Sequence, residues 1–230
     1  VVGIVAALAA AELGARVLFP QLSPITGERV SYWCYDDTLG WAHRPGQYGR
    51  FRHPDFDIDV RINSRGLRDD EYPEARAARD RRRRLLVLGD SFAWGFGVEH
   101  RERFSEIIER RHPDWEVINA GVSGYGTDQE LLYLRGRGLR YHPDVVLLLF
   151  HVNDFENNIR SSEYWYNKPR FTLDHGQPIA GNIPVPPSTF KQRLNRFFYG
   201  HTWILGRVYA VAAAATRELR RPLWSRAAGT

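Results

Sequence analysis

Three short polar stretches carry residues that could perform acyl transfer. They read GDS at residues 89–91, NAGVSGYG at 119–126 and ND at 153–154, and each follows an apolar run. A serine hydroxyl attacks an ester carbonyl when a base activates it. The oxyanion that forms must then meet hydrogen-bond donors already in place. A serine, a glycine-containing loop and an asparagine supply both the nucleophile and such donors.

From the residues alone, Ser91 is the candidate nucleophile. Its own backbone N–H would lie at the start of a short helix, where negative charge is favoured. Gly124 can bring its backbone N–H close because it has no Cβ, and Asn153 offers a side-chain NH₂ donor. The sequence therefore predicts a nucleophile with a three-donor oxyanion hole. For Asp90 we expect a structural role, binding loop amides, because adjacent side chains point apart.

The segment from residue 84 to residue 154 predicts the strands that would position these residues. LLVLG before Asp90 and VVLLLF before His151 are continuous apolar runs, typical of strands covered on both faces. WEVIN at 115–119 is the strand between them. We therefore expect parallel strands whose carboxyl ends meet at one edge of a sheet, where ligands bind.

Helices are predicted between these strands. ERFSEIIERR at 102–111 places Phe104, Ile107 and Ile108 on one helical face. A second helix should begin at Thr127, because Thr127 and Glu130 have the spacing of a capping box. The order β-α-β-α-β predicts an α/β domain with a parallel sheet.

The motifs GDSFAWG, NAGVSGYGT and HVND resemble the first three sequence blocks of the SGNH/GDSL hydrolases. The resemblance is close over residues 84–155, and the flanking segments resemble a membrane-anchored bacterial subgroup. It implies a flavodoxin-like three-layer α/β/α fold with a parallel sheet, the SGNH hydrolase fold, incomplete in this chain. It also implies an esterase, lipase or acyltransferase with Ser91 as nucleophile and Ser91 N–H, Gly124 N–H and the Asn153 side chain as the oxyanion hole.

The general base of that family is a histidine in a late Asp-x-x-His motif, and no such motif follows Asn153. Of the eight histidines, His151 shares a strand face with Asn153; we expect a supporting or packing role for it, with a substitute base as the alternative. The others lie in sequence typical of loops, surface turns or helix ends: His43, His53, His100, His112, His142, His175 and His201. We therefore expect the base to lie on chain beyond these 230 residues, and the 230-residue chain to be inactive or nearly so.

The chain divides into three predicted regions. Residues 1–20 are apolar and predict part of a transmembrane or signal-anchor helix, or else an amphipathic helix packed on the domain. Residues 21–80 predict an extension of loops and short strands, including a half-exposed strand at FDIDVRIN. Residues 81–230 predict the hydrolase domain, with the C-terminal part missing. An insertion is expected at about 156–190, and its Pro and Gly content is typical of a hairpin.

Composition sets further bounds. Hydrophobic residues make up 43% and charged residues 26%, as in a globular protein. The net charge of +5 is no nucleic-acid-binding excess, and the run of four arginines at 81–84 is typical of a solvated lead-in to a strand. The single Cys34 excludes an intramolecular disulfide. No cofactor or metal is expected, because a metal-dependent phosphohydrolase would need more ligands at the strand ends.

Three functions fit these observations. The first is a serine esterase that acts on an extracytoplasmic lipid or glycan ester through an acyl-enzyme. The second transfers the acyl group to a glycan hydroxyl from the same nucleophile. The third is a non-catalytic, membrane-tethered binding or assembly module. All three place the domain on the extracytoplasmic side of a membrane and leave the oligomeric state open.

Overall fold

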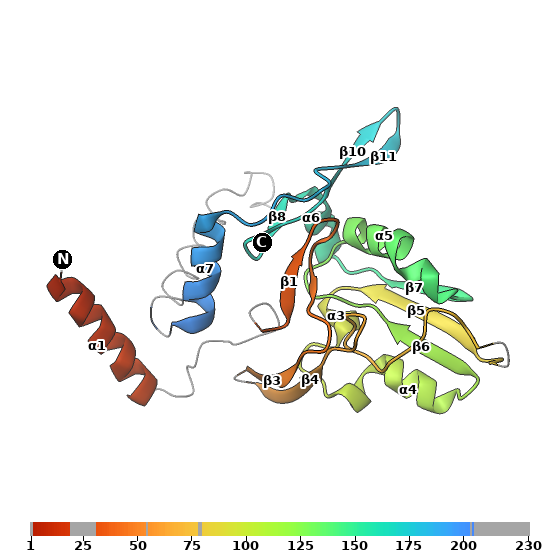
Figure 1. The fold of residues 1–230 in the computed structure, drawn as a ribbon, viewed down its shortest axis with the longest axis horizontal. Helices are drawn as coiled ribbons and strands as arrows, with labels where there is room; N and C mark the ends of the chain where they lie inside the picture. The colour runs from red at the N-terminus through yellow and green to blue at the C-terminus, as the bar shows by residue number, and fades with distance from the viewer. Residues whose placement is uncertain (1, 19–30, 54, 78–79, 203, 205–230) are drawn as a thin grey trace, which may run out of the picture.

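The computed structural model describes residues 2–18, 31–53, 55–77, 80–202 and 204. Figure 1 shows their arrangement, with a sheet between helices on one side of the molecule and α1 and α7 on the other. Before the sheet come α1 (Val2–Leu18), β1 (Trp33–Asp36), β2 (Gly40–His43), β3 (Tyr48–His53) and β4 (Phe56–Arg61). The sheet region comprises β5 (Arg83–Gly89), α3 (Ser91–Trp94), η2 (His100–Glu102), α4 (Phe104–Arg111), β6 (Trp115–Asn119), α5 (Thr127–Gly136), η3 (Gly138–Tyr141), β7 (Val145–Leu149) and α6 (Asn153–Ile159). After it come β8 (Ser162–Glu163), β9 (Tyr166–Asn167), β10 (Arg170–Asp174), β11 (Gln177–Gly181) and α7 (Phe190–His201).

The central sheet has three parallel strands in the order β6-β5-β7. β5 is hydrogen-bonded on both sides, and its last residue, Gly89, pairs with Leu149 of β7. All three strands therefore deliver the residues that follow them to one edge of the sheet. This arrangement confirms the predicted α/β class and agrees with a partial flavodoxin-like fold.

Alternate residues of β5 face two different helical layers. Leu85 and Val87 pack with Phe104 and Ile108 of α4, as the helical pattern at 102–111 predicts. Leu86 and Leu88 belong to the cluster on the other face, where side chains of α5 such as Tyr133 pack. A run that is apolar at every position is needed because both faces of β5 are covered.

The N-terminal hairpins pack onto this sheet region. β1 pairs with β2 and β3 pairs with β4, both antiparallel, and β4 lies within the predicted half-exposed strand. Trp33 and Trp41 share a core cluster with Leu86 of β5. The expectation that His43 lies in a solvated loop is wrong: only 2% of it is exposed, and its ring stacks on that of Trp94 at 6.1 Å.

Two further expectations fail for identifiable reasons. β7 was expected to be buried on both faces, but both of its faces are partly exposed: the residues from Val145 to Leu148 are 37–46% exposed. In the described part of the chain β7 pairs only with β5 and is therefore an edge strand. The capping box is also wrong, since Gly126 caps α5 and the Thr127 hydroxyl instead accepts a hydrogen bond from the Asn158 side chain at 2.6 Å.

The two ends of the described chain contact each other. The guanidinium of Arg16 in α1 donates to the carbonyl of His201 at 2.9 Å. Among the described helices, none combines the length and the apolar character needed to cross a membrane. The predicted insertion contains the β10–β11 hairpin, with His175 in its turn. The periodicity and alanine content of residues 193–221 predict one or two helices. α7 covers the first part of this stretch, and the rest lies outside the described residues, apart from Thr202 and Ile204.

Candidate active site

Ser91 is the first residue of α3, directly after β5 and Asp90. Asp90 caps the helix, because its Oδ1 accepts the backbone N–H of Phe92 at 2.9 Å. A Cβ at Gly89 would lie 2.7 Å from the Ala93 Cβ and 3.2 Å from that of Leu149. Glycine is therefore required where the chain turns from β5 into α3 beside Leu149 of β7.

Asn153 is joined to this turn by a direct hydrogen bond. Its Nδ2 donates to Asp90 Oδ2 at 2.9 Å, and its Oδ1 contacts Nδ1 of His151. Asp90 is only 2% exposed, and each of its two carboxylate oxygens accepts a hydrogen bond from the protein. The structural role predicted for Asp90 is confirmed, and the turn of Ser91 lies beside Asn153.

Gly124 is held at the same edge by the loop after β6. The backbone N–H of Val122, two residues earlier, donates to the carbonyl of Gly89 at 3.0 Å. Gly124 has a φ of +80°, and a Cβ there would lie 2.6 Å from the Tyr164 ring. Both the left-handed backbone and the close ring favour glycine. The catalytic roles of Ser91, Gly124 and Asn153 stay predictions, now with a common location.

The first and second loops are packed directly against each other. A Cβ at Gly121 would lie 2.5 Å from the backbone nitrogen of Trp94 and 2.7 Å from the Ala93 carbonyl carbon. The Asn119 side chain donates to the Ala93 carbonyl at 2.7 Å and accepts from the Gly121 N–H at 3.0 Å. The position of α3 is therefore fixed by the loop that carries Gly124.

Arg68, from the N-terminal segment, supports the other end of α3. Its guanidinium donates to the carbonyls of Gly95 and Val98, each at 2.7 Å, and to that of Trp94 at 3.2 Å. It also lies 4.5 Å from the centre of the Trp94 ring. These bonds satisfy carbonyls that the end of a helix leaves open. The sequence offered no local pattern for this contact, since Arg68 lies 23 residues before Ser91.

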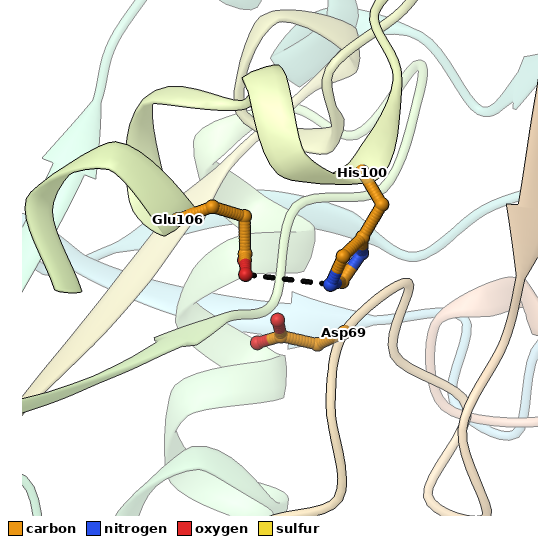
Figure 2. A group of neighbouring side chains, drawn as sticks. All are labelled: Asp69, His100 and Glu106. Carbon is orange, nitrogen blue, oxygen red and sulfur yellow. Dashed lines mark ion pairs between the residues drawn. The ribbon is translucent and has the colours of Figure 1, made fainter. Parts of the chain in front are cut away.

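Next to Arg68, Asp69 forms a group with His100 and Glu106 (Figure 2). One ligand atom from each lies within 4.8 Å of the others, and His100 Nε2 is 3.3 Å from Glu106 Oε2. Arg103, however, donates to Asp69 at 3.0 Å and to Glu106 at 2.7 Å, so a cation is already present. The other oxygen of Asp69 accepts the backbone N–H of Asn119 at 2.7 Å. We therefore assign this group a structural role at the end of β6.

Two buried carboxyl groups lie close enough to Asp90 to interact with its charge. Glu130 and Asp154 are 2% and 0% exposed. Both oxygens of Glu130 and one of Asp154 have no hydrogen-bond partner among the described residues. Burial, with Asp154 and Asp90 nearby, raises the pKa of Glu130 to about 8. Glu130 is therefore protonated at neutral pH.

No base is bonded to the Ser91 hydroxyl: within the described ranges, neither an imidazole nor a carboxylate is hydrogen-bonded to it. The ring centre of His151 is 4.5 Å from that of Phe92, which follows Ser91. His175 is in the β10–β11 turn, and His201 ends α7.

Comparison with known proteins agrees with this geometry. Residues 87–219 match the family model of the GDSL-like lipase/acylhydrolase family. The chain belongs to this family, as the three motifs predict. Membership supports an ester-hydrolase function. No curated protein matches the chain.

Replacing Gly121 with alanine should destabilise the junction between the two loops. The added methyl group would overlap the backbone of α3, and overpacking of this kind typically costs about 1–3 kcal/mol. Urea unfolding measures the loss. Gly136→Ala is the matched control, because a Cβ there meets nothing within 4 Å; equal stability of the two variants would contradict the close packing.

Replacing Glu130 with glutamine should make stability less dependent on pH. The folded protein keeps the Glu130 proton up to a pKa of about 8, whereas the unfolded chain loses it near 4.5. The free energy of unfolding of the wild type should therefore fall as the pH rises between these values. Urea unfolding at pH 5.5 and pH 8.5 should show a smaller fall for Glu130→Gln. The exposed Glu156→Gln serves as control, and an unchanged fall in Glu130→Gln would refute the assignment.

Proposed function

We propose that the protein is a serine hydrolase that cleaves acyl esters through an acyl-enzyme on Ser91. The observation that carries the proposal is the Asp90 carboxylate, which joins the turn of Ser91 to the side chain of Asn153. The candidate nucleophile, Ser91, and the candidate oxyanion donor, Asn153, are thus positioned by the same buried carboxylate. The family match supports the same class of reaction.

In this mechanism Ser91 Oγ attacks the ester carbonyl carbon while a base takes its proton. The carbonyl oxygen becomes an oxyanion, which accepts hydrogen bonds from Ser91 N–H, Gly124 N–H and Asn153 Nδ2. The C–O bond to the alcohol then breaks, and the alcohol leaves with the proton from the base. Water attacks the acyl-enzyme in the same way and releases the acid and the free serine.

We further propose that the general base is carried by a strand that pairs with the exposed side of β7. The family's Asp-x-x-His motif does not occur between Asn153 and Thr230. The exposed side of β7 offers a place for a further parallel strand. The carboxyl end of such a strand would reach the edge where Ser91 lies.

For the substrate, we propose an extracytoplasmic lipid or glycan ester. Phe92, next to Ser91, is 62% exposed, and Phe96 is 44% exposed. Tyr164 borders Gly124. Exposed aromatic rings beside a nucleophile can contact an acyl chain or stack on a sugar ring. Trp94, in the same motif, is fully buried and serves the core instead.

Ser91→Ala, made in the complete gene product, should abolish hydrolysis of a short-chain aryl ester while leaving the fold intact. Loss of a serine nucleophile lowers kcat by about 10³-fold or more. Steady-state kinetics measures the loss, and circular dichroism checks the fold. Ser162→Ala, at an exposed position of β8, is the control. Unchanged turnover in Ser91→Ala would remove Ser91 as the nucleophile.

We also propose that the apolar N-terminal stretch holds the protein at a membrane. Deleting residues 1–20 should move the protein from the membrane fraction to the supernatant, because this stretch carries the apolar surface that would enter the bilayer. Fractionation of cells that express each form measures the shift. The same distribution for both forms would contradict the proposal.

A further inference from the structure

We propose that His151 is a positioning residue that holds the Asn153 side chain with its NH₂ group facing the oxyanion. The inference rests on the proposed function, because it assigns a role within that oxyanion hole. His151 belongs to the HVND motif, but the resemblance assigns it no catalytic role. Its evidence is a set of contacts around one side-chain amide.

An asparagine amide can take two orientations that differ by a 180° turn, and only one presents N–H to an oxyanion. Asp90 Oδ2 lies 2.9 Å from one end of the Asn153 amide. An ionised carboxylate only accepts hydrogen bonds, so that end must be Nδ2. One hydrogen of Nδ2 is used by Asp90, and the second is available for the substrate.

The other end of the amide is then Oδ1, and it contacts Nδ1 of His151. An amide oxygen only accepts, so Nδ1 of His151 must carry the hydrogen. This donor and Asp90 act on opposite ends of the same group and favour the same orientation. Without the imidazole, Asp90 would be the one described residue whose side chain holds the amide in this orientation.

His151 is itself held at its ring and at its backbone. Its ring centre lies 4.5 Å from that of Phe92, which follows Ser91. Its backbone N–H donates to Asp154 Oδ2 at 2.9 Å, and its carbonyl accepts the Asp154 N–H at 3.0 Å. A donor held in this way can define the position of Asn153.

The strand register explains why His151 is available for this role. Gly89 of β5 pairs with Leu149 of β7. Ser91 and His151 each lie two residues beyond that pair. They therefore follow neighbouring strands at equivalent positions. The protonated nitrogen of a neutral histidine is set by the hydrogen bond it makes. His151 should therefore carry its hydrogen on Nδ1 and keep the lone pair on Nε2.

The first experiment reads this tautomer directly in the complete gene product and needs no catalytic activity. Nitrogen-15 spectra of the neutral imidazole, recorded at pH 8.5, should show His151 protonated at Nδ1 and unprotonated at Nε2. Asn153→Ala should remove this preference, because the acceptor is lost. A wild-type His151 protonated at Nε2 would overturn the proposal, whether or not the protein hydrolyses esters.

The second experiment measures ester hydrolysis by the complete gene product. His151→Asn keeps a donor near the position of Nδ1, whereas the isosteric His151→Leu does not, and neither can act as a base. Loss of an oxyanion donor costs about 10²–10³-fold in kcat, so His151→Leu should lose about 10-fold or more with KM nearly unchanged. His151→Asn should recover most of that loss. The exposed His175→Leu is the control.

Two kinetic results would contradict the role of His151. Wild-type kcat in His151→Leu would show that the donor is not needed. An equal and severe loss in both variants would indicate a general base instead of a positioning residue. If the wild type itself cleaves no ester, the proposed function fails, and the tautomer measurement still decides whether His151 orients Asn153.

Discussion

The geometry of the candidate site depends on the carboxylate of Asp90. One oxygen accepts the N–H of Phe92 and begins the helix that presents Ser91, and the other accepts the side-chain amide of Asn153. A buried carboxylate needs such donors, because an ionised group without them would be costly in this environment. The residue next to the nucleophile therefore links the ends of two neighbouring strands. A protonated or amide side chain could not accept from both partners in the same way.

The framework of the site extends beyond the segment that matches the family model. That match begins at residue 87, yet Arg68 and Asp69, which precede it, bind the backbone of the two loops that form the site. Arg68 binds the carbonyls at the end of α3, and Asp69 binds the Asn119 N–H at the start of the second loop. Arg103 joins the pair, because it donates to Asp69 and contacts the Arg68 carbonyl. The N-terminal segment thus contributes to the position of Ser91 without touching the proposed chemistry.

Much of the fold could be predicted, because local patterns determine it. An apolar run that ends in Gly-Asp-Ser indicates a buried strand and its turn, and β5 is buried on both faces. The same reasoning was wrong for β7, because an apolar run does not show which neighbour covers it. The burial of His43 and the contacts of Arg68 could not be predicted, since both depend on partners far away in the sequence. The glycines of the site were recognisable as loop residues, but the rings and backbones that require them appear only in three dimensions.

The central claim is that Ser91 is a nucleophile whose oxyanion is stabilised at this sheet edge. The most direct test is to treat the complete gene product with a fluorophosphonate, which traps activated serines, and to locate the adduct by peptide mass spectrometry. The phosphonyl oxygen of the adduct stands in for the oxyanion. We predict one adduct, on the peptide that contains Ser91, and its loss after denaturation of the protein before treatment. An adduct on another residue, or none on a folded protein that still cleaves esters, would contradict the claim.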